Sequence, residues 1–203
     1  MNIAIIFAGG VGTRMNTKDR PKQFLMVHGK PIIVHTIEKF QEHAEIDGII
    51  VVCVKDWINY MKEMQFRYRL DKIAKIVPGG KTGQLSIYAG LKAAEDIFGV
   101  DDNIVLIHDG VRPLIGKQII SDNIESVKKY GSAVTCAPTK ESVVLIDEKN
   151  NITEVVERNE SRTAKAPESF YLKDILAADE EAISKGIINE IDSCTLMAHH
   201  RLL

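Results

Sequence analysis

The sequence predicts an α/β protein built on a doubly wound, mostly parallel sheet. Three observations support this prediction: short, uniformly apolar segments resemble buried parallel strands, helical periodicity fills the intervals between them, and a glycine-rich turn directly follows the first strand. Strands buried on both faces are apolar throughout, and strands that alternate with helices form a sheet covered on both sides. The 203 residues suffice for one domain, which we expect to span 1–203.

The elements are expected to alternate along the chain. The strands are predicted at Ile3 to Phe7, Ile49 to Val54, Ile73 to Val77, Ile104 to Ile107, and Ala133 to Cys136. Helical spacing follows Pro31, a residue favoured in a first turn, and two further helices are predicted to end at Gly99 and near Gly131. Sheets of this class bind ligands beyond the carboxyl ends of their strands, where the glycine-rich turn lies.

The segment from Ser142 to Val156 departs from this alternation. Val143 to Ile146 and Ile152 to Val156 flank a polar turn, a pattern typical of a β-hairpin. An isolated hairpin is marginally stable in water, so it needs a surface to pack against. The simplest surface is the same hairpin of a second subunit. We therefore expect residues 140–157 to form a dimerisation arm, with a hairpin folded back on its own domain as the alternative.

The composition excludes several classes of protein. Hydrophobic residues make up 45% and charged residues 27%, which is ordinary for a globular protein and excludes a largely disordered chain. The net charge of −2 argues against nucleic-acid binding, and no apolar run approaches the ~20 residues of a membrane span. Cys53, Cys136 and Cys194 are widely separated and odd in number, which indicates a reducing compartment and a cytoplasmic protein. His199 and His200 lack partners at zinc-ligand spacing.

The glycine-rich turn predicts a nucleoside triphosphate site. In Ala8-Gly9-Gly10-Val11-Gly12-Thr13-Arg14-Met15 the glycines let backbone N–H groups approach an anion, and Arg14 adds a positive charge. Lys22 follows a proline that holds the backbone extended, so two cations flank one phosphate-sized space. The dinucleotide pattern G-x-G-x-x-G lacks its third glycine, and the phosphate-loop pattern G-x-x-x-x-G-K-[ST] is absent from the sequence. A purely structural turn is the alternative.

Two more segments follow predicted strands. Asp109, in His108-Asp109-Gly110-Val111-Arg112-Pro113, ends a buried strand and can hold a divalent cation against triphosphate oxygens, which implies Mg²⁺. The alternatives are a turn cap for Asp109 and a surface ion pair for Arg112. Pro78-Gly79-Gly80-Lys81-Thr82-Gly83-Gln84-Leu85-Ser86 leads from a strand into a helix, where its N–H groups and the Ser86 hydroxyl could read a base or ribose. An ordinary loop is the alternative.

A charged cluster follows the predicted hairpin. It contains Arg158, Arg162 and Lys165-Ala166-Pro167-Glu168, for which a solvated run is the alternative to a binding role.

Over essentially its whole length the chain resembles the sugar-alcohol phosphate cytidylyltransferases. This family includes the 2-C-methyl-D-erythritol 4-phosphate and D-ribitol 5-phosphate enzymes. The matching segments are Ala8 to Met15, Pro21 to Gln23, Gly79-Gly80, Ser86, His108 to Pro113, and Arg158. The resemblance implies a homodimeric Rossmann-like domain with a projecting arm, which transfers CMP from CTP to an alditol phosphate in a Mg²⁺-dependent reaction and releases pyrophosphate. Lys55-Asp56-Trp57-Ile58-Asn59 and the His108 segment are more similar to the ribitol type.

The resemblance also implies a role for each matching residue. Arg14 and Lys22 would be the catalytic residues that stabilise charge on the triphosphate, and Asp109 would lie beside the metal. CTP would contact Phe7, Ala8, Gly9, Gly10, Gly12, Gly79, Gly80, Gly83, Ser86 and Asp109. The acceptor phosphate would be bound by Arg112, Ser142 and Arg158, either within one subunit or across the dimer. Because the attacking phosphate oxygen is already anionic, positioning and charge stabilisation would suffice for catalysis.

The chain departs from the family pattern at three places. Gly83 stands where an arginine is usual, and Glu168 stands where a glutamine usually follows the proline. The sequence stops at Leu203, and we expect it to be short relative to the family, whose members place an acceptor-binding lysine further on. Two alternatives therefore stay open: a 2-C-methyl-D-erythritol 4-phosphate cytidylyltransferase of isoprenoid synthesis, and a catalytically weakened nucleotide-binding subunit or fragment of a teichoic-acid or capsule enzyme.

Overall fold

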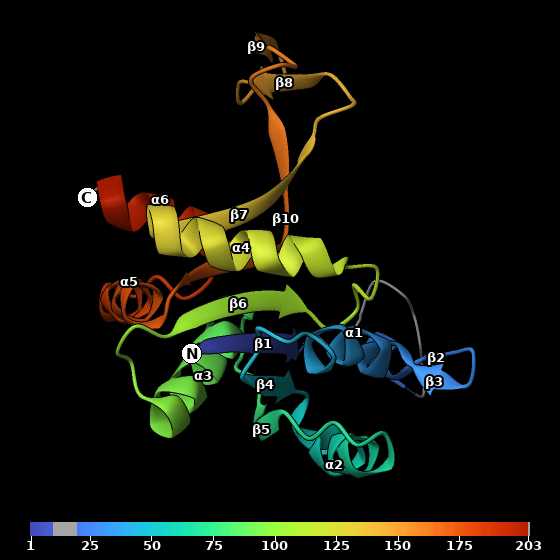
Figure 1. Cartoon of the computed structure of the whole chain (residues 1–203). Coiled ribbons are helices and arrows are strands. Elements are labelled where there is room, and N and C mark those ends of the chain that lie inside the picture. The colour runs from blue at the N-terminus through green and yellow to red at the C-terminus, as the bar shows by residue number, and fades with distance from the viewer. Residues whose placement is uncertain (10–19, 203) are drawn as a thin grey trace.

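The computed structural model describes residues 1–9 and 20–202, so Gly10, Gly12 and Arg14 lie outside the described residues. The central sheet of the described part has the strand order β5-β4-β1-β6-β10-β7 (Figure 1). Its strands are β1 (Asn2–Ala8), β4 (Gly48–Cys53), β5 (Ile73–Pro78), β6 (Ile104–Asp109), β7 (Ser132–Pro138) and β10 (Arg162–Tyr171). β1 pairs in parallel with β4 and β6, and β4 pairs in parallel with β5, whereas β10 is antiparallel to both β6 and β7. The predicted mostly parallel sheet is confirmed.

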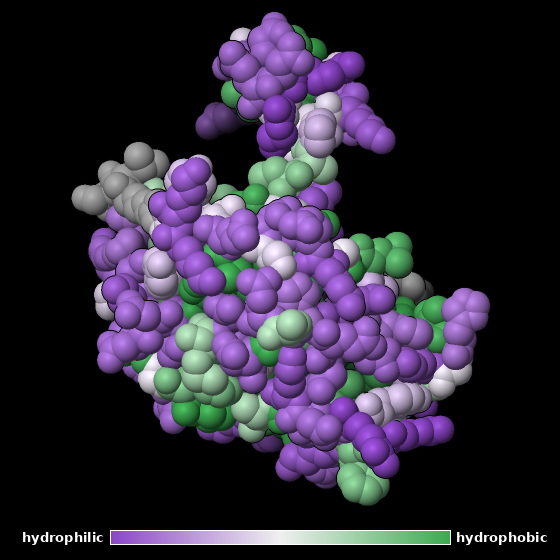
Figure 2. Space-filling model, viewed as in Figure 1, coloured by the Kyte–Doolittle hydropathy of each residue, from purple (hydrophilic) through white to green (hydrophobic). Residues whose placement is uncertain are grey.

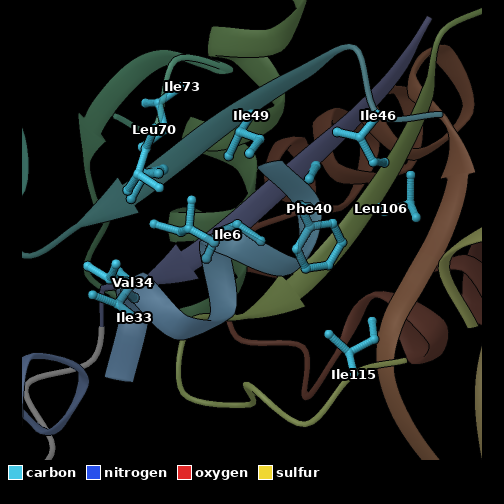
Figure 3. Close-up of a cluster of buried hydrophobic side chains, with 14 of the residues drawn as sticks. Ile6, Ile33, Val34, Phe40, Ile46, Ile49, Leu70, Ile73, Leu106 and Ile115 are labelled. Atoms are coloured by element: carbon cyan, nitrogen blue, oxygen red, sulfur yellow. The ribbon is translucent and has the colours of Figure 1, made fainter. Parts of the chain in front are cut away.

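Helices cover both faces of this sheet. Residues alternate along β1, so that Ala4 and Ile6 face one core and Ile3 and Ile5 face the other. The first core is completed by α1 (Ile32–Gln41), α2 (Ile58–Arg67) and α4 (Lys117–Tyr130), and the second by α3 (Gly83–Phe98), α5 (Leu172–Ser184) and α6 (Ser193–Leu202). Figure 3 shows the first core, where Phe40 of α1 lies near Ile6 and Leu106 of the sheet. The double winding that the sequence predicts is therefore present.

Local sequence explains where the predicted helices begin and end. Pro31 directly precedes α1, and its backbone dihedrals are extended rather than helical. Gly99 and Gly131 end α3 and α4 with φ of 74° and 86°, values that favour a residue without a Cβ atom. The remaining short elements are the 3₁₀ helices η2 (Lys22–Phe24) and η3 (Lys55–Trp57) and the small hairpin of β2 (Met26–Val27) and β3 (Lys30–Pro31).

The predicted hairpin is formed by β8 (Val143–Ile146) and β9 (Ile152–Val156), which pair antiparallel in a sheet of their own. It projects from the body at the far ends of β7 and β10 and does not fold back on the central sheet, so that alternative is wrong (Figure 1). Figure 2 shows it standing clear of the body. Exposed apolar side chains gather on it: Val143, Val144, Leu145, Ile146, Ile152 and Val155.

Candidate active site

The site lies where the direction of the strand order reverses. β1 has β4 on one side and β6 on the other, and a crevice at such a point is the usual binding site of a doubly wound sheet. Phe7 of β1 is directly opposite Asp109 of β6, and the N–H of Gly110 donates to the carbonyl oxygen of Phe7 over 3.0 Å. The turn that begins at Ala8 and the predicted metal carboxylate are therefore neighbours.

The second glycine loop approaches the first one closely. A Cβ atom on Gly79 would lie 3.2 Å from Cα of Gly9 and 3.0 Å from Oγ of Ser86, so a larger residue there would push the two loops apart. The Ser86 hydroxyl accepts from the N–H of Gly80 (3.0 Å) and donates to the carbonyl oxygen of Thr82 (2.8 Å). Ser86 thus shapes the loop itself, and its contact with a nucleotide stays a prediction.

Lys22 is held near the end of β1 by its neighbour Gln23. The Gln23 side-chain amide, which is buried, donates to the carbonyl oxygen of Ala8 over 2.7 Å. The next residue, Phe24, stacks on Trp57 with ring centroids 4.9 Å apart. These two anchors fix η2, at whose first residue the partly exposed Lys22 lies. Sequence reasoning assigned no role to Gln23, because a buried amide reveals its partner only in three dimensions.

A pocket of about 450 Å³ opens beside Asp109. Among the predicted site residues it is lined by Phe7, Gly83, Asp109 and Arg112. A Cβ atom on Gly83 would meet nothing within 4 Å, so the wall of the pocket is open at this residue. Arg112 forms an ion pair with Asp109, so the alternative of an ion pair for Arg112 is found in the structure. The pair joins Nε of Arg112 to Oδ2 of Asp109, and the carboxylate and the guanidinium each have further atoms that can bind a metal or a phosphate.

The pocket also contains carboxylates that the sequence did not single out as site residues. Glu168 on β10 is 9% exposed, and its Oε2 accepts from the N–H of Cys194 at the start of α6 over 2.9 Å. Burial raises the pKa of Glu168 to about 7, and the nearby carboxylates of Asp192 and Asp109 contribute to the increase. Glu168 therefore lines the pocket, and the alternative interpretation of a solvated charge run is wrong for this residue.

Ser142 and Arg158 lie outside this pocket. Ser142 precedes β8 and Arg158 follows β9, and both are exposed at the projecting hairpin. Arg112, in contrast, lines the pocket at the end of β6. The structure of one chain thus does not bring the three predicted acceptor-binding residues together.

The donor set suits a magnesium ion that is shared with a substrate. In the part of the chain that the structure describes, no group of three or more His, Cys, Asp or Glu residues could hold a metal ion by itself. Asp109 is close enough to Glu168 to affect its pKa, so two carboxylates face the same space. Mg²⁺ is commonly bound by one or two carboxylates together with substrate phosphates and water. The residues present fit that arrangement.

Fold and site together define a Rossmann-like nucleotidyltransferase. The family model for 2-C-methyl-D-erythritol 4-phosphate cytidylyltransferase matches residues 2–200, and the chain belongs to this family. None of the described helices has the length and apolar character needed to cross a bilayer.

Several curated relatives carry the name ribitol-5-phosphate cytidylyltransferase. The protein from Streptococcus agalactiae serotype V is 59% identical over 197 residues, which are 97% of this chain and 82% of the relative. The protein from Vibrio parahaemolyticus serotype O3:K6 is 50% identical over 200 residues, 98% of this chain and 84% of the relative. Among solved structures, 4-diphosphocytidyl-2C-methyl-D-erythritol synthase from Anaerococcus prevotii matches with a TM-score of 0.84 and 26% identity, covering 98% of this chain and 84% of that one.

Proposed function

We propose that the protein transfers CMP from CTP to D-ribitol 5-phosphate and yields CDP-ribitol and pyrophosphate. The observation that carries the proposal is the 59% identity, over 97% of the chain, to a protein named ribitol-5-phosphate cytidylyltransferase. The geometry supports it, because the glycine loops and a pocket for a second substrate meet at the carboxyl end of β6.

The proposed chemistry follows from charge and position. The nucleotide lies along Gly9, Gly79 and Gly80, whose two loops pack closely together because these residues have no side chains. Lys22, together with Arg14, stabilises the charge that develops on the triphosphate. The acceptor phosphate oxygen attacks the α-phosphorus and needs no side-chain base, because it is already anionic. When bound at Asp109, Mg²⁺ would supply charge neutralisation to the phosphate oxygens.

The dimer is part of the proposal. Ser142 and Arg158 lie on the projecting hairpin, away from the pocket of their own chain, and the hairpin carries exposed apolar side chains. We propose that the arm of one subunit brings these residues to the acceptor site of the other. A cytoplasmic location belongs to the proposal as well, because Cys53, Cys136 and Cys194 are free thiols.

The second candidate acceptor is 2-C-methyl-D-erythritol 4-phosphate. The name of the matching family model supports it. The same pocket and the same nucleotide loops would serve either acceptor, so the choice depends on the groups that line the pocket.

Pyrophosphate release from CTP with each acceptor tests these assignments. Release with ribitol 5-phosphate is the expected result, release with only methylerythritol phosphate would favour the second candidate, and CTP binding without release would indicate a weakened nucleotide-binding subunit.

Lys22→Ala and Arg14→Ala should each lower kcat about 100-fold or more without loss of the fold. Lys39→Ala, on the exposed side of α1, is the matched control. A near-normal kcat in either site variant would refute the assigned roles.

A further inference from the structure

A carboxylate that the proposed chemistry does not use lies at the inner wall of the pocket. Asp179, on α5, lines the pocket and is 1% exposed. Its Oδ1 accepts from the side-chain amide of Gln84 over 3.2 Å. Its Oδ2 is buried and has no hydrogen-bond partner among the described residues. Because a buried carboxylate oxygen without a donor is costly, this atom is a candidate for binding a ligand donor.

Gln84 fixes the orientation of this carboxylate. Its Nε2 also donates to the carbonyl oxygen of Ile187 over 3.1 Å, and its Oε1 accepts from the N–H of Glu190 over 3.0 Å. The amide is therefore held from both ends and is not free to turn toward Oδ2 of Asp179. A rigidly held carboxylate with one oxygen that accepts no hydrogen bond is the arrangement expected of a preorganised binding group.

The pocket offers complementary chemistry at different walls. Arg112, after β6, and Lys165, on β10, provide cationic groups, whereas Gln84 and Asp179 belong to the helices α3 and α5. The apolar side chains of Phe7, Ile107 and Leu196 also line it. An anionic group of a ligand can bind at Arg112 or Lys165, and a hydrogen-bond donor can bind at the carboxylates that also line the pocket: Asp109, Glu168, Asp179, Glu190 and Asp192. A polyol phosphate has both.

The charge state of Asp179 suits this role. Burial raises the pKa of its carboxyl group to about 6, while the hydrogen bond from Gln84 acts in the opposite direction. The group is therefore mostly ionised at neutral pH, and an ionised acceptor forms stronger hydrogen bonds with a hydroxyl than a neutral one does.

We propose that Oδ2 of Asp179 accepts a hydrogen bond from a hydroxyl group of the acceptor's polyol chain and thereby contributes to the choice of acceptor. The inference rests on the proposed function and supplies a basis for discriminating between its two candidate acceptors. D-ribitol 5-phosphate has a longer unbranched chain and one more hydroxyl group than 2-C-methyl-D-erythritol 4-phosphate. A site built around a substrate hydroxyl group rejects an analogue that lacks this group, because the buried carboxylate oxygen is then left without a hydrogen-bond donor.

The test is steady-state pyrophosphate release with ribitol 5-phosphate and with its monodeoxy analogues, each lacking one hydroxyl group. Wild-type enzyme should discriminate against one analogue, and Asp179→Ala should abolish that discrimination. The variant should also raise KM for ribitol 5-phosphate about 10- to 100-fold, the range for a hydrogen bond to a charged group, with kcat and KM for CTP little changed. Glu180→Gln, on the exposed side of the same helix, is the control.

The outcomes separate the two proposals. If the wild type releases no pyrophosphate with ribitol 5-phosphate, the proposed function fails and this inference fails with it. If the wild type is active but Asp179→Ala keeps the full discrimination, or changes KM for CTP as much as KM for the acceptor, the inference is overturned and the proposed function stands. If Asp179→Ala does not fold, the isosteric variant Asp179→Asn serves as the test. We expect Asp179→Asn to weaken the discrimination between ribitol 5-phosphate and the same monodeoxy analogue, and full discrimination in this variant would overturn the inference.

Discussion

The side-chain amide of Gln23 donates a buried hydrogen bond of 2.7 Å to the carbonyl oxygen of Ala8. Ala8 is the last residue of β1, and Gln23 follows Lys22 in η2. The bond therefore connects the two segments that are predicted to contact the triphosphate. It places Lys22 close to the beginning of the glycine turn.

Gln23→Ala should lower both stability and turnover. The Ala8 carbonyl loses its side-chain donor, which should cost about 1–3 kcal/mol of unfolding free energy. Lys22 is then less well positioned, so kcat/KM for CTP should fall by about tenfold or more. Urea unfolding and pyrophosphate release measure the two effects, with the exposed Gln118→Ala on α4 as the control. Unchanged kinetics in a destabilised Gln23→Ala would leave this residue a purely structural role.

Two glycines of the second loop should respond oppositely to alanine. A Cβ atom on Gly80 would lie 2.6 Å from Cβ of Leu85 and 2.8 Å from its carbonyl carbon, so Gly80→Ala should destabilise the fold by about 1–3 kcal/mol. Gly83 has open space around it, and Gly83→Ala at the start of α3 should be neutral or stabilise by up to ~1 kcal/mol. Chemical denaturation of both variants checks the contrast. Equal stabilities would contradict the loop geometry.

Glu168→Gln should change how stability depends on pH. The folded-state pKa of Glu168 is raised from 4.5 to about 7, so between these values the folded protein binds more protons than the unfolded chain. The unfolding free energy therefore falls as pH rises through this window, and Glu168 accounts for about 3 kcal/mol of the fall. The neutral glutamine removes this contribution. The melting temperature of Glu168→Gln, relative to that of wild type, should therefore rise between pH 5 and pH 8. The melting temperature of Glu154→Gln, a variant at an exposed residue of β9, should depend on pH as that of wild type does.

A charge on the projecting hairpin should dissociate the proposed dimer. Leu145 and Ile152 are 49% and 63% exposed, and burying a charge between two arms without a partner is unfavourable. Leu145→Asp should sediment as a monomer at micromolar concentration and lose most of its turnover, because Ser142 and Arg158 no longer reach a partner. Phe66→Asp changes an equally apolar and more exposed residue on α2 and should leave both properties intact. A monomeric wild type would refute the dimer.

The sequence predicts the parallel part of the sheet well, for a physical reason. β1, β4 and β6 are buried on both faces, so their residues are almost uniformly apolar and recognisable without any partner. The adjacency of Phe7 and Asp109 follows from the same pattern, because neighbouring parallel strands end at one edge of the sheet.

β10 shows where sequence reasoning stops. Its first half contains the charged residues Arg162 and Lys165, and Pro167 cannot donate a hydrogen bond to a neighbouring strand. Its pairing also shifts register between Ala164 and Glu168. The sequence alone therefore does not indicate a strand here. The segment is nevertheless a strand, because it pairs with β6 on one side and with β7 on the other. Gln84 and Asp179 were missed for a related reason, because the partner of a buried polar group on a helix is set by tertiary packing.

Because β10 runs opposite to β6, its early residues, and not its last ones, reach the edge of the sheet where β1 and β6 end. Under the proposed function, the nucleotide loops lie upstream of β7 in the sequence, whereas the pocket is lined from both sides of β7, by Arg112 upstream and by Lys165 and Asp179 downstream. If the proposed function holds, substitutions downstream of β7 would change part of the acceptor pocket without changing the nucleotide loops. The acceptor preference of the proposed enzyme would then be able to change through the downstream residues while the sheet stays the same.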